Sequence, residues 1–486
     1  MRKTQAEKEK KTPIFDRQSV NRQSAQKVKK GVFLILAAEE NASVNVPFLN
    51  ALKRFAKERK AQIVILPVGA HRREADVDAV LDSRLEQFES SFTTDLTLNK
   101  NLRIAELELN SQQINPLTGL KRIPHGEESL IVGHSKQHLE SYPTGNSADA
   151  EPRIICTTGL ITLPRYRSNR IGKIAAKDHI LGCLIVEVAN EETFHIRQIQ
   201  CLDAKGSFCD LDRRYYADRN SVKERIEAIV VGDDHPGYTD AVAWKATREM
   251  IKALQPKQIF RHDWFDASSV SHHHISMSSK IDTPKELQTL AGEVQVGRKM
   301  LAEYLSVAPA DCIINHVASN HPEHLGKYLD DWSRWSCDAA NYDLALDCEY
   351  FRRRFQQDPL QWLLLREETK LNKKELTLRP ASHPRVRFLD EDADMRVEGV
   401  YVSAHGDKGN GGTRGSPVQM ESLYSNSITG HTHKISIRHG SMVVGGLVRR
   451  DMSYRKGPNG WSHANAIIHK GGGKQLIIII KGRWRL

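Results

Sequence analysis

The chain has 486 residues, of which 39% are hydrophobic and 27% charged, and a formal net charge of +11. This length and composition predict a globular protein of two or three domains with sizeable cores. No window approaches the roughly 18 apolar residues of a membrane span, the N-terminus lacks the apolar core of a secretory signal, and the seven cysteines include no C-x-x-C pair, so we expect a protein of a reducing cytoplasm.

The positive charge is concentrated at the two ends of the chain. Residues 1–30 carry ten Lys and Arg against three Asp and Glu, a net +7, and residues 467–486 carry five Lys and Arg and no acid, a net +5. The remaining chain therefore has a net charge of −1. We expect residues 1–30 to form a disordered basic arm, which would either attract a polyanion or simply keep the protein soluble.

Residues 31–220 are expected to form an N-terminal α/β domain of unknown role, with nucleic-acid contact as one candidate role. Apolar runs at 32–38 and 61–69 flank an amphipathic stretch at 46–60, a pattern that predicts strand, helix, strand. Short β-like runs dominate from 151 to 215. No internal repeat or low-complexity tract stands out in the sequence.

Within this domain, residues 164–177 form a candidate surface for a nucleic-acid backbone. The segment contains one aromatic residue and five cations, namely Tyr166, Arg165, Arg167, Arg170, Lys173 and Lys177. Cationic side chains near an aromatic ring suit phosphate contacts. An ordinary solvated loop has the same composition, so both interpretations remain open.

Residues 221–486 show a different pattern, in which short apolar strands end in polar clusters and are followed by helical segments. This alternation predicts a layered α/β domain, in which functional groups gather at the carboxyl ends of the strands. The clusters contain, in chain order, Asp233 and His235, Asp263, Asn320 and His321, His405, and His431 and His433. Asp, Asn and His side chains without cysteine favour Mn, Fe or Zn over Ca, and argue against a closed structural zinc site.

The series D-x-H, D, N-H, H and G-H-x-H resembles the calcineurin-like metallophosphoesterase superfamily, over residues 226–450. The resemblance implies a four-layer α/β/β/α sandwich for the catalytic domain, with the basic C-terminal strand as its last element. It also implies two divalent metal ions, with Mn²⁺ as first choice and Mg²⁺, Fe or Zn as alternatives. The implied reaction is attack on a phosphodiester by a hydroxide that bridges the two metals.

The resemblance assigns a role to each residue of the clusters. Asp233, His235 and His433 would hold one metal, Asn320, His405 and His431 the second, and Asp263 would bridge both. His321 would stabilise the phosphoryl oxygens or protonate the leaving group, so His321 and Asp263 are the predicted catalytic residues. Two positions depart from the family pattern, because His262 and Ser319 stand where the family usually has glycine.

Several neighbouring residues have a weaker signal. Asp234, Asp266 and Asp407 could orient imidazole N–H groups, although solvated carboxylates or helix caps are equally acceptable interpretations. The His run at 272–274 would either line a substrate cleft or lie in an exposed polar loop. The glycine-rich stretch 406–412 has no following Lys-Ser/Thr pair, so we do not interpret it as a nucleotide P-loop.

The basic ends, the 164–177 segment and the large N-terminal region favour DNA as the substrate. The arrangement resembles the repair-nuclease branch of the superfamily and the large nucleases of some bacteriophages, and Trp484 in the basic C-terminal stretch is a candidate for base stacking. Two alternatives remain: a phosphatase or phosphodiesterase acting on small nucleotides, and a nucleic-acid-binding regulatory protein with a non-catalytic metal site. We expect no membrane partner, and the sequence leaves the oligomeric state open.

Overall fold

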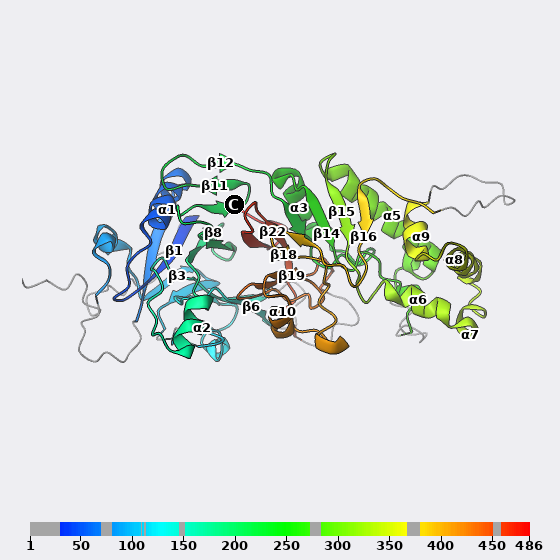
Figure 1. Ribbon diagram of the computed structural model, residues 1–486, viewed down its shortest axis with the longest axis horizontal. Helices are drawn as coiled ribbons and strands as arrows, with labels where there is room; N and C mark the ends of the chain where they lie inside the picture. Colours follow the sequence, from blue (N-terminus) through cyan, green and yellow to red (C-terminus); the bar gives the residue numbers. More distant parts are fainter. Residues whose placement is uncertain are drawn as a thin grey trace, which may run out of the picture.

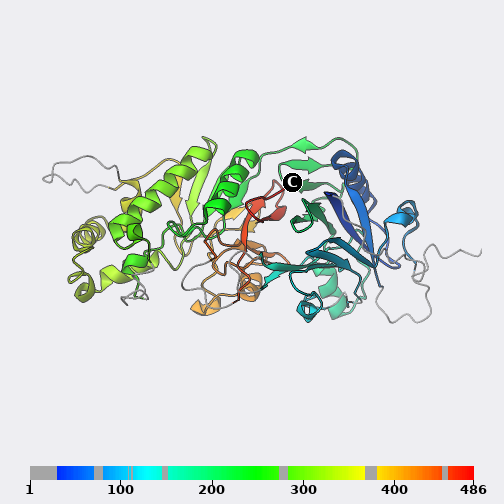
Figure 2. The ribbon, with the colours of Figure 1, turned by 180° about the vertical axis from the view of Figure 1, so that it is seen from behind.

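The computed structural model describes residues 30–69, 80–107, 109–110, 113–144, 151–272, 283–366, 380–450 and 458–486. The protein has a mixed α/β fold with several sheets, in an elongated molecule whose N-terminal and C-terminal halves lie at opposite ends (Figure 1; Figure 2 shows the reverse side). Among the described helices, none combines the length and apolar character needed to cross a lipid bilayer. Most of the predicted basic arm, residues 1–29, lies outside the described residues.

The N-terminal half begins with the predicted strand, helix and strand. These are β1 (Gly31–Glu39), α1 (Val46–Arg59) and β2 (Gln62–Val68). The side chain of Asn45 caps α1 by accepting from Phe48 N (3.0 Å), and α1 ends at Lys60 in a left-handed conformation. Strand β1 pairs with β2 in parallel and with β8 (Gly182–Val188) in antiparallel fashion, and β9 (Phe194–Gln200) completes a four-stranded sheet.

A ten-stranded sheet contains strands from both halves of the chain. Its order is β17-β18-β19-β21-β20-β6-β7-β5-β4-β3. The N-terminal strands are β3 (Asp95–Asn99), β4 (Leu102–Ala105), β5 (Ser129–Val132), β6 (Leu139–Tyr142) and β7 (Arg153–Thr157). The C-terminal strands are β17 (Arg396–Val397), β18 (Val400–Tyr401), β19 (Ser427–Thr429), β20 (Ser436–Arg438) and β21 (Ser441–Val443).

A six-stranded sheet belongs to the C-terminal half and has the order β16-β15-β14-β13-β22-β23. Its strands are β13 (Ala228–Val230), β14 (Gln258–Arg261), β15 (Ile313–His316), β16 (Val386–Phe388), β22 (His463–Ile468) and β23 (Lys474–Ile479). Helices α3 (Ala241–Leu254) and α5 (Leu290–Val307) connect its parallel strands. Such crossovers place helices against a face of the sheet.

The remaining elements lie around these sheets. A small three-stranded sheet contains β10 (Phe208–Asp210), β11 (Arg213–Tyr215) and β12 (Val222–Lys223). The further helices are α2 (Arg170–Asp178), α6 (Glu323–Asp330), α7 (Trp332–Trp335), α8 (Tyr342–Phe355), α9 (Pro359–Leu365) and α10 (Pro417–Tyr424). Short 3-10 turns occur at Ser83–Ser91, Leu120–Arg122, Ser268–Val270, Lys285–Leu287 and Asn410–Gly412.

One continuous apolar core fills the space between the ten-stranded sheet and the other two large sheets. It contains alternate residues of the facing strands, such as Ile35 of β1, Val230 of β13, Ile428 of β19 and Ile478 of β23. The other faces of the four- and six-stranded sheets are covered by helices: α1 packs on the first, and α3 and α5 pack on the second. Side chains of a strand point alternately to its two faces, so the apolar runs in the sequence correspond to strands buried on both sides.

The same strand connections occur twice in the chain. The order β2-β1-β8-β9 of the N-terminal half matches β14-β13-β22-β23 of the C-terminal half, with one parallel and two antiparallel pairings in each. The ten-stranded sheet has the order β3-β4-β5-β7-β6 from one edge and β17-β18-β19-β21-β20 from the other, and the two series meet at the antiparallel pair β6–β20. The topology therefore contains a repeat that does not stand out in the sequence.

The predicted division into residues 31–220 and 221–486 stays a prediction. The three-stranded sheet at Phe208–Lys223 coincides with this boundary and, together with the shared ten-stranded sheet, links the two halves (Figure 1). In addition, β9 lies against β23, and Gln475 of β23 accepts a hydrogen bond from Leu211 N (2.8 Å). The two halves thus share both core and hydrogen bonds.

A buried ionic cluster stabilises the N-terminal half. Arg197 of β9 donates to Asp210 Oδ1 (2.7 Å) and to Glu187 Oε1 (2.9 Å), and all three side chains are at most 1% exposed. Burial by itself raises the pKa of Glu187, but the neighbouring Arg197 lowers it to about 2. The Glu187 carboxylate is therefore charged at neutral pH and depends on the guanidinium.

We expect Arg197→Met to lower the free energy of unfolding by about 3–5 kcal/mol, because it leaves two buried carboxylates without their main counter-charge. Urea unfolding monitored by circular dichroism measures this change. Arg213→Met is the matched control, since Arg213 is 42% exposed and lies 3.6 Å from Glu58, and its loss should cost less than about 1 kcal/mol. Equal effects of the two substitutions would contradict the assignment of a buried, paired cation.

Candidate metal centre

The site is built from residues that follow buried strands. Asp233 and His235 follow β13, Asp263 follows β14, and His431 and His433 follow β19. His405 follows β18 in the facing sheet, and His321 lies between β15 and α6. These strands belong to two sheets that pack face to face, and their carboxyl ends bring the polar side chains together.

Asp263 lies at the centre of the cluster. Its Oδ2 atom is 3.2 Å from Nε2 of His235 and 3.3 Å from Nε2 of His405. His235 and His405 come from strands in different sheets, so Asp263 contacts imidazoles on two sides. The bridging role that the sequence resemblance implies for Asp263 stays a prediction.

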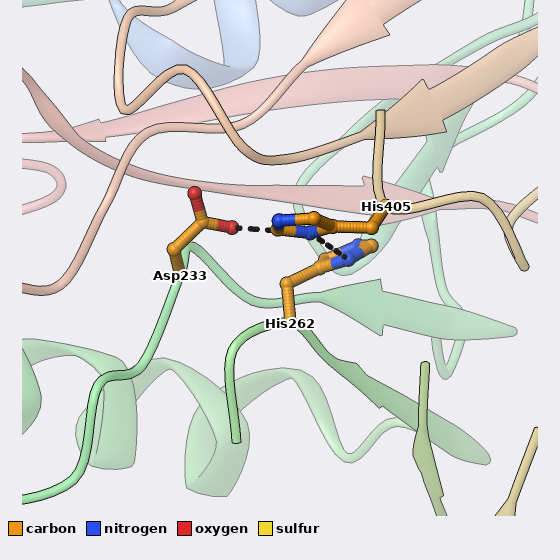
Figure 3. A group of neighbouring side chains, drawn as sticks. All are labelled: Asp233, His262 and His405. Atoms are coloured by element: carbon orange, nitrogen blue, oxygen red, sulfur yellow. Dashed lines mark hydrogen bonds and ion pairs between the residues drawn. The ribbon is translucent and has the colours of Figure 1, made fainter. Parts of the chain in front are cut away.

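Asp233 forms the second carboxylate of the cluster. Its Oδ2 is 3.3 Å from Nε2 of His433, and its Oδ1 is 4.0 Å from Nδ1 of His405. Figure 3 shows Asp233, His405 and His262 together, with the two imidazoles in contact through their Nδ1 atoms at 3.3 Å. His262 is fully buried, so its ring is fixed beside the cluster.

Three groups of side chains could each hold a metal ion. They are Asp233 with His262 and His405, His235 with Asp263 and His433, and His235 with Asp266 and His321. Within each group the ligand atoms lie within 4.8 Å of one another. The first two groups are entirely buried, and both border on Asp263 or its partner His405. The buried His and Asp groups therefore make a divalent metal plausible.

The tautomer of His235 is fixed by Asp266. Nδ1 of His235 donates to Asp266 Oδ1 (2.9 Å), so the lone pair of the neutral imidazole is on Nε2. That Nε2 atom lies 3.2 Å from Nε2 of His433 and 3.2 Å from Asp263 Oδ2. A cation would relieve the repulsion among such converging acceptors, and a carboxylate behind the ligating imidazole is the usual support of a metal site.

His321 shares the same supporting carboxylate. Its Nδ1 lies 2.6 Å from Asp266 Oδ1, and its ring is in edge contact with that of His235 at a centroid distance of 4.6 Å. The imidazole is 30% exposed, in contrast to the buried His235. His321 thus borders the cluster on the side open to solvent.

Among the described contacts, Asp234 supports the fold and has no hydrogen bond to an imidazole. Its carboxylate accepts from Arg261 Nε (2.6 Å) and from Tyr304 Oη (2.7 Å), and the guanidinium lies over the Tyr304 ring. These contacts fasten the end of β13 to β14 and to helix α5. Asp407, the third candidate for imidazole orientation, has no hydrogen bond to the His405 ring among the described contacts. Burial lowers the pKa of His405, Asp263 and Asp233 raise it, and the charge of Asp407 adds to their effect.

The backbone of the site adopts an unusual conformation at four predicted ligands. The φ angles are 42° at His235, 43° at Asp263, 75° at His431 and 54° at His433. Residues with a Cβ atom rarely occupy this left-handed region, and such conformations persist where the surrounding structure imposes them. These four strained backbone conformations occur together at the site, which indicates that the surrounding structure holds the four side chains in place at the cost of local strain.

The structure explains why a glycine, Gly430, precedes the two histidines. A Cβ atom at this position would lie 2.2 Å from Oδ1 of Asp233 and 3.2 Å from Cγ of His262. The backbone amide of Gly430 also donates to His405 O (2.7 Å). Only a residue without a side chain allows the β19 turn to approach Asp233 this closely.

The charges in the cluster are mutually compensating. Burial raises the pKa of Asp233 to about 7, despite the opposing effect of His405. Burial acts in the same direction on Asp263, but His405, His321 and His235 together bring the pKa of Asp263 well below its usual range. Burial lowers the pKa of His405, yet Asp263 and Asp233 raise it to about 9. The buried carboxylates therefore require a positive partner, which a proton or a metal ion can supply.

The donor set fits a divalent transition metal. Within the described residues, Oδ1 of Asp263 and Oδ1 of Asn320 are buried and have no hydrogen-bond donor, although buried oxygens normally have one. Two carboxylates, an amide oxygen and several imidazoles, without cysteine, suit Mn, Fe or Zn. The residues present thus fit the metals that the sequence resemblance implies.

Some of the predicted site residues have few contacts with the cluster around Asp263. His431 meets the cluster through an edge contact with His405 at a ring distance of 5.2 Å. Asn320 directly precedes His321 in the chain, and its assignment as a metal ligand stays a prediction. Of the 272–274 histidines, residues 273 and 274 lie outside the described residues, and His272 is exposed beside the ring of His324.

His262 is a member of the site that the sequence analysis treated only as a departure from the family pattern. It follows strand β14 directly and precedes the predicted bridging residue Asp263, and both are buried. The sequence feature that could have identified His262 is its position directly after a buried strand and next to a predicted ligand. The comparison with the family pattern, which has glycine at this position, led the sequence analysis to overlook it.

Part of the predicted nucleic-acid surface is accessible. Arg167, Arg170 and Lys173 are exposed on and before helix α2, and Arg165 is exposed but donates to Asn41 O (2.6 Å). The stacking role predicted for Trp484 is wrong, because this ring is 5% exposed and packs in the core beneath α3. Lys474 is also removed from the surface, since its ammonium donates to Gly440 O and burial lowers its pKa to about 7.

Comparison with known proteins finds a relative in a bacteriophage. The chain is 26% identical over 474 residues to "Protein A1" of Escherichia phage T5, an alignment that covers 93% of this chain and 82% of the phage protein. No protein-family model matches the sequence, and no solved structure is similar to it.

Proposed function

We propose that the protein is a metal-dependent phosphodiesterase that hydrolyses DNA. The observation that carries the proposal is the convergence on Asp263 of buried imidazoles from different strands, His235 on one side and His405 on the other. The layering of helices, two facing sheets and a buried cluster at the strand ends agrees with the calcineurin-like sandwich that the sequence resemblance implies. Two divalent ions held there would polarise the phosphate and activate water.

The protein's own residues would serve positioning and proton transfer. Asp233 and Asp263 would offset the repulsion between the ions, while Asp266 holds His235 in the tautomer that offers Nε2. His321 receives the same support from Asp266 and is exposed enough to meet a substrate. We assign His321 to protonation of the departing oxygen.

The charge of helix α2 favours a polymer as the substrate. Helix α2, which carries Arg170, Lys173 and Lys177, is joined to helix α10 through His439, whose Nε2 lies 3.2 Å from Asp178 and whose Nδ1 contacts Glu421. Helix α10 lies between the ligands His405 and His431 in sequence. The basic helix thus contacts the segment that connects two predicted ligands, and we propose that a polyanion reaches both.

The function is tested by offering purified protein linear DNA, circular DNA, RNA, a mononucleotide and a generic phosphodiester, with Mn²⁺, Mg²⁺ or EDTA. We expect cleavage of DNA with Mn²⁺ and none with EDTA. Hydrolysis of the mononucleotide without cleavage of DNA would favour the small-nucleotide alternative. Binding of DNA without hydrolysis of any substrate would favour a non-catalytic regulatory protein.

We expect His321→Gln to reduce DNA hydrolysis by about 10²-fold or more, because the alkoxide leaving group then departs without a proton donor. The same variant should retain most of its activity on bis(p-nitrophenyl) phosphate, since nitrophenolate is a stable anion. Steady-state rates on the two substrates measure the difference. An equal loss on both substrates would contradict proton donation by His321.

We expect removal of the positive charges on and just before α2 to weaken both DNA binding and the dependence of that binding on salt. In the variant Arg167→Ala, Arg170→Ala, Lys173→Ala, the slope of log K against log [salt] should decrease by up to about 0.9 for each phosphate that the helix no longer neutralises. Fluorescence anisotropy with a labelled duplex measures the slope. The control is Lys245→Ala, Lys252→Ala on α3, at the opposite edge of the molecule (Figures 1 and 2). A slope unchanged by the α2 substitutions would remove this helix from the interface.

A further inference from the structure

The glycine-rich segment that follows the predicted ligands on β18 forms a hairpin, which we call the glycine hairpin (residues 406–415). Lys408 and Arg414 face each other in an antiparallel bridge. The two ends of the hairpin are joined by a hydrogen bond from Gly415 N to Asp407 O (2.6 Å). The stretch that lacks the signature of a nucleotide P-loop therefore has a defined conformation of its own.

The glycine hairpin packs directly against the turn that carries the last two predicted ligands. Gly406 has a φ angle of 107°, and a Cβ atom there would lie 3.3 Å from Gly430 O. A Cβ atom at Gly415 would collide with the carbonyl group of Gly406. On the other side, Nε2 of Gln419 in helix α10 donates to Thr413 Oγ1 (3.2 Å). Glycine at the base thus allows the hairpin to lie between this turn and α10.

The two cations of the glycine hairpin have different surroundings. Nζ of Lys408 lies 2.8 Å from Glu323 Oε1 and also contacts Glu391, so its charge is neutralised and it fastens the hairpin to the start of helix α6. Arg414 is exposed, and its guanidinium has no hydrogen bond or ion pair among the described residues. The hairpin therefore presents one cation that the described part of the chain does not use.

Arg414 lies at the rim of the candidate metal centre. Burial lowers the pKa of His431 to about 4, and the charges of His405 and Arg414 act in the same direction. Salt screens exposed charges over about 10 Å, so this effect agrees with a position of Arg414 near the imidazole. Asp263 and His405 are at most 2% exposed, His431 is half-buried and Arg414 is exposed. Exposure therefore increases from the centre towards the arginine.

A guanidinium at this position suits a phosphate group. Its planar set of N–H donors matches two oxygens of a phosphate, which gives a stronger and more directional contact than an ammonium does. In a polynucleotide, further charged phosphates follow on both sides of the reacting one. A cation at the rim would meet such a neighbouring phosphate, whereas a single phosphoester has no second phosphate to offer.

We propose that Arg414, held by the glycine hairpin, binds the phosphate next to the scissile one and so favours polynucleotides over single phosphoesters. The position of the scissile phosphate rests on the proposed function, whereas the capture of a phosphate by Arg414 does not. The ion pairs of Lys408 hold the hairpin in place before the substrate arrives, which reduces the entropy lost on binding.

The inference is tested with the full-length protein, Mn²⁺ and a single-stranded oligonucleotide in which one phosphate at a time is replaced by a neutral methylphosphonate. Product analysis identifies the bond that is cut. Arg414→Ala should lower kcat/KM for the unmodified oligonucleotide by about 10-fold or more, mainly through KM, and for bis(p-nitrophenyl) phosphate by at most about twofold. With the methylphosphonate at one position beside the cleaved bond, the wild type and Arg414→Ala should become equal.

Two further variants support the interpretation of this result. Arg414→Lys should recover part of the loss, because an ammonium keeps the charge but not the paired donors. The matched control is Arg354→Ala, which removes an exposed arginine from helix α8 at the outer end of the C-terminal half (Figure 1). It should cleave the unmodified oligonucleotide as the wild type does.

A loss in Arg414→Ala that persists whichever phosphate is replaced would overturn the inference, and so would an equal loss on bis(p-nitrophenyl) phosphate. If the wild type hydrolyses no substrate, the proposed function fails, and the same methylphosphonate series is applied to the dissociation constant measured by fluorescence anisotropy. An effect of Arg414→Ala on the dissociation constant that disappears at one position would still support the phosphate site. An effect that is the same at every position, or none, would overturn it.

Discussion

Asp263→Asn should reduce the rate of metal-dependent DNA hydrolysis by about 10³-fold or more while leaving DNA affinity unchanged. The substitution keeps the shape of the side chain but removes the negative charge between His235 and His405. Two cations held there would then repel each other without the carboxylate that would offset this repulsion. Steady-state cleavage rates with Mn²⁺ and a titration of Mn²⁺ by calorimetry measure the two consequences.

The control for this substitution is Asp218→Asn, which changes an exposed aspartate between β11 and β12. It should leave the cleavage rate and the Mn²⁺ affinity unchanged. Retention of more than a tenth of the activity in Asp263→Asn would contradict a bridging role for this carboxylate. A loss of DNA binding together with hydrolysis would indicate general unfolding, which the melting temperature reports.

Gly430→Ala should reduce hydrolysis and Mn²⁺ affinity by about 10²-fold each. The new methyl group would lie 2.2 Å from Asp233 Oδ1, so either the carboxylate or the turn that carries His431 and His433 must move. Displacement of a reacting or ligating group by about 1 Å is sufficient for losses of this size. Cleavage rates and Mn²⁺ titration again provide the measurement.

Gly326→Ala is the matched control, because a Cβ atom at this position in helix α6 meets no atom within 4 Å. Alanine favours a helix over glycine, so this variant should be unchanged in activity and slightly more stable. If Gly430→Ala retained wild-type hydrolysis, the turn would not depend on the close approach to Asp233. The assignment of that turn to the active centre would then fail.

The sequence predicts the local elements of the site well, and the structure shows why. Asp233, Asp263 and His433 each follow a strand that appears in the sequence as a short apolar run, and strand ends on one edge of a sheet necessarily meet. Asp266 lies three residues after the predicted ligand Asp263, and His321 directly follows the predicted ligand Asn320. Their shared contact, Asp266 Oδ1 to Nδ1 of both His235 and His321, depends on a turn geometry that periodicity does not reveal.

The ten-stranded sheet and the repeated framework lie beyond sequence periodicity. The pairing of β6 with β20 joins residues about 300 positions apart, and apolar alternation specifies which face is buried but not which strand is the neighbour. The Gly-His pair at 133–134 matches the one at 430–431, yet the side chains nearest to Gly133 are Val68, Leu66 and Ala37, whereas those nearest to Gly430 are Asp233 and His262. The repeat is therefore recognisable only from the strand order.

The most direct test of the central claim is anomalous diffraction from crystals soaked in Mn²⁺. The account predicts two anomalous peaks per chain, both within ligand distance of Asp263, with His235 and His433 near one and His405 near the other. No peak in the N-terminal half is expected. Crystals that show Mn²⁺ elsewhere, or none beside Asp263 at saturating concentration, would contradict a paired-metal centre.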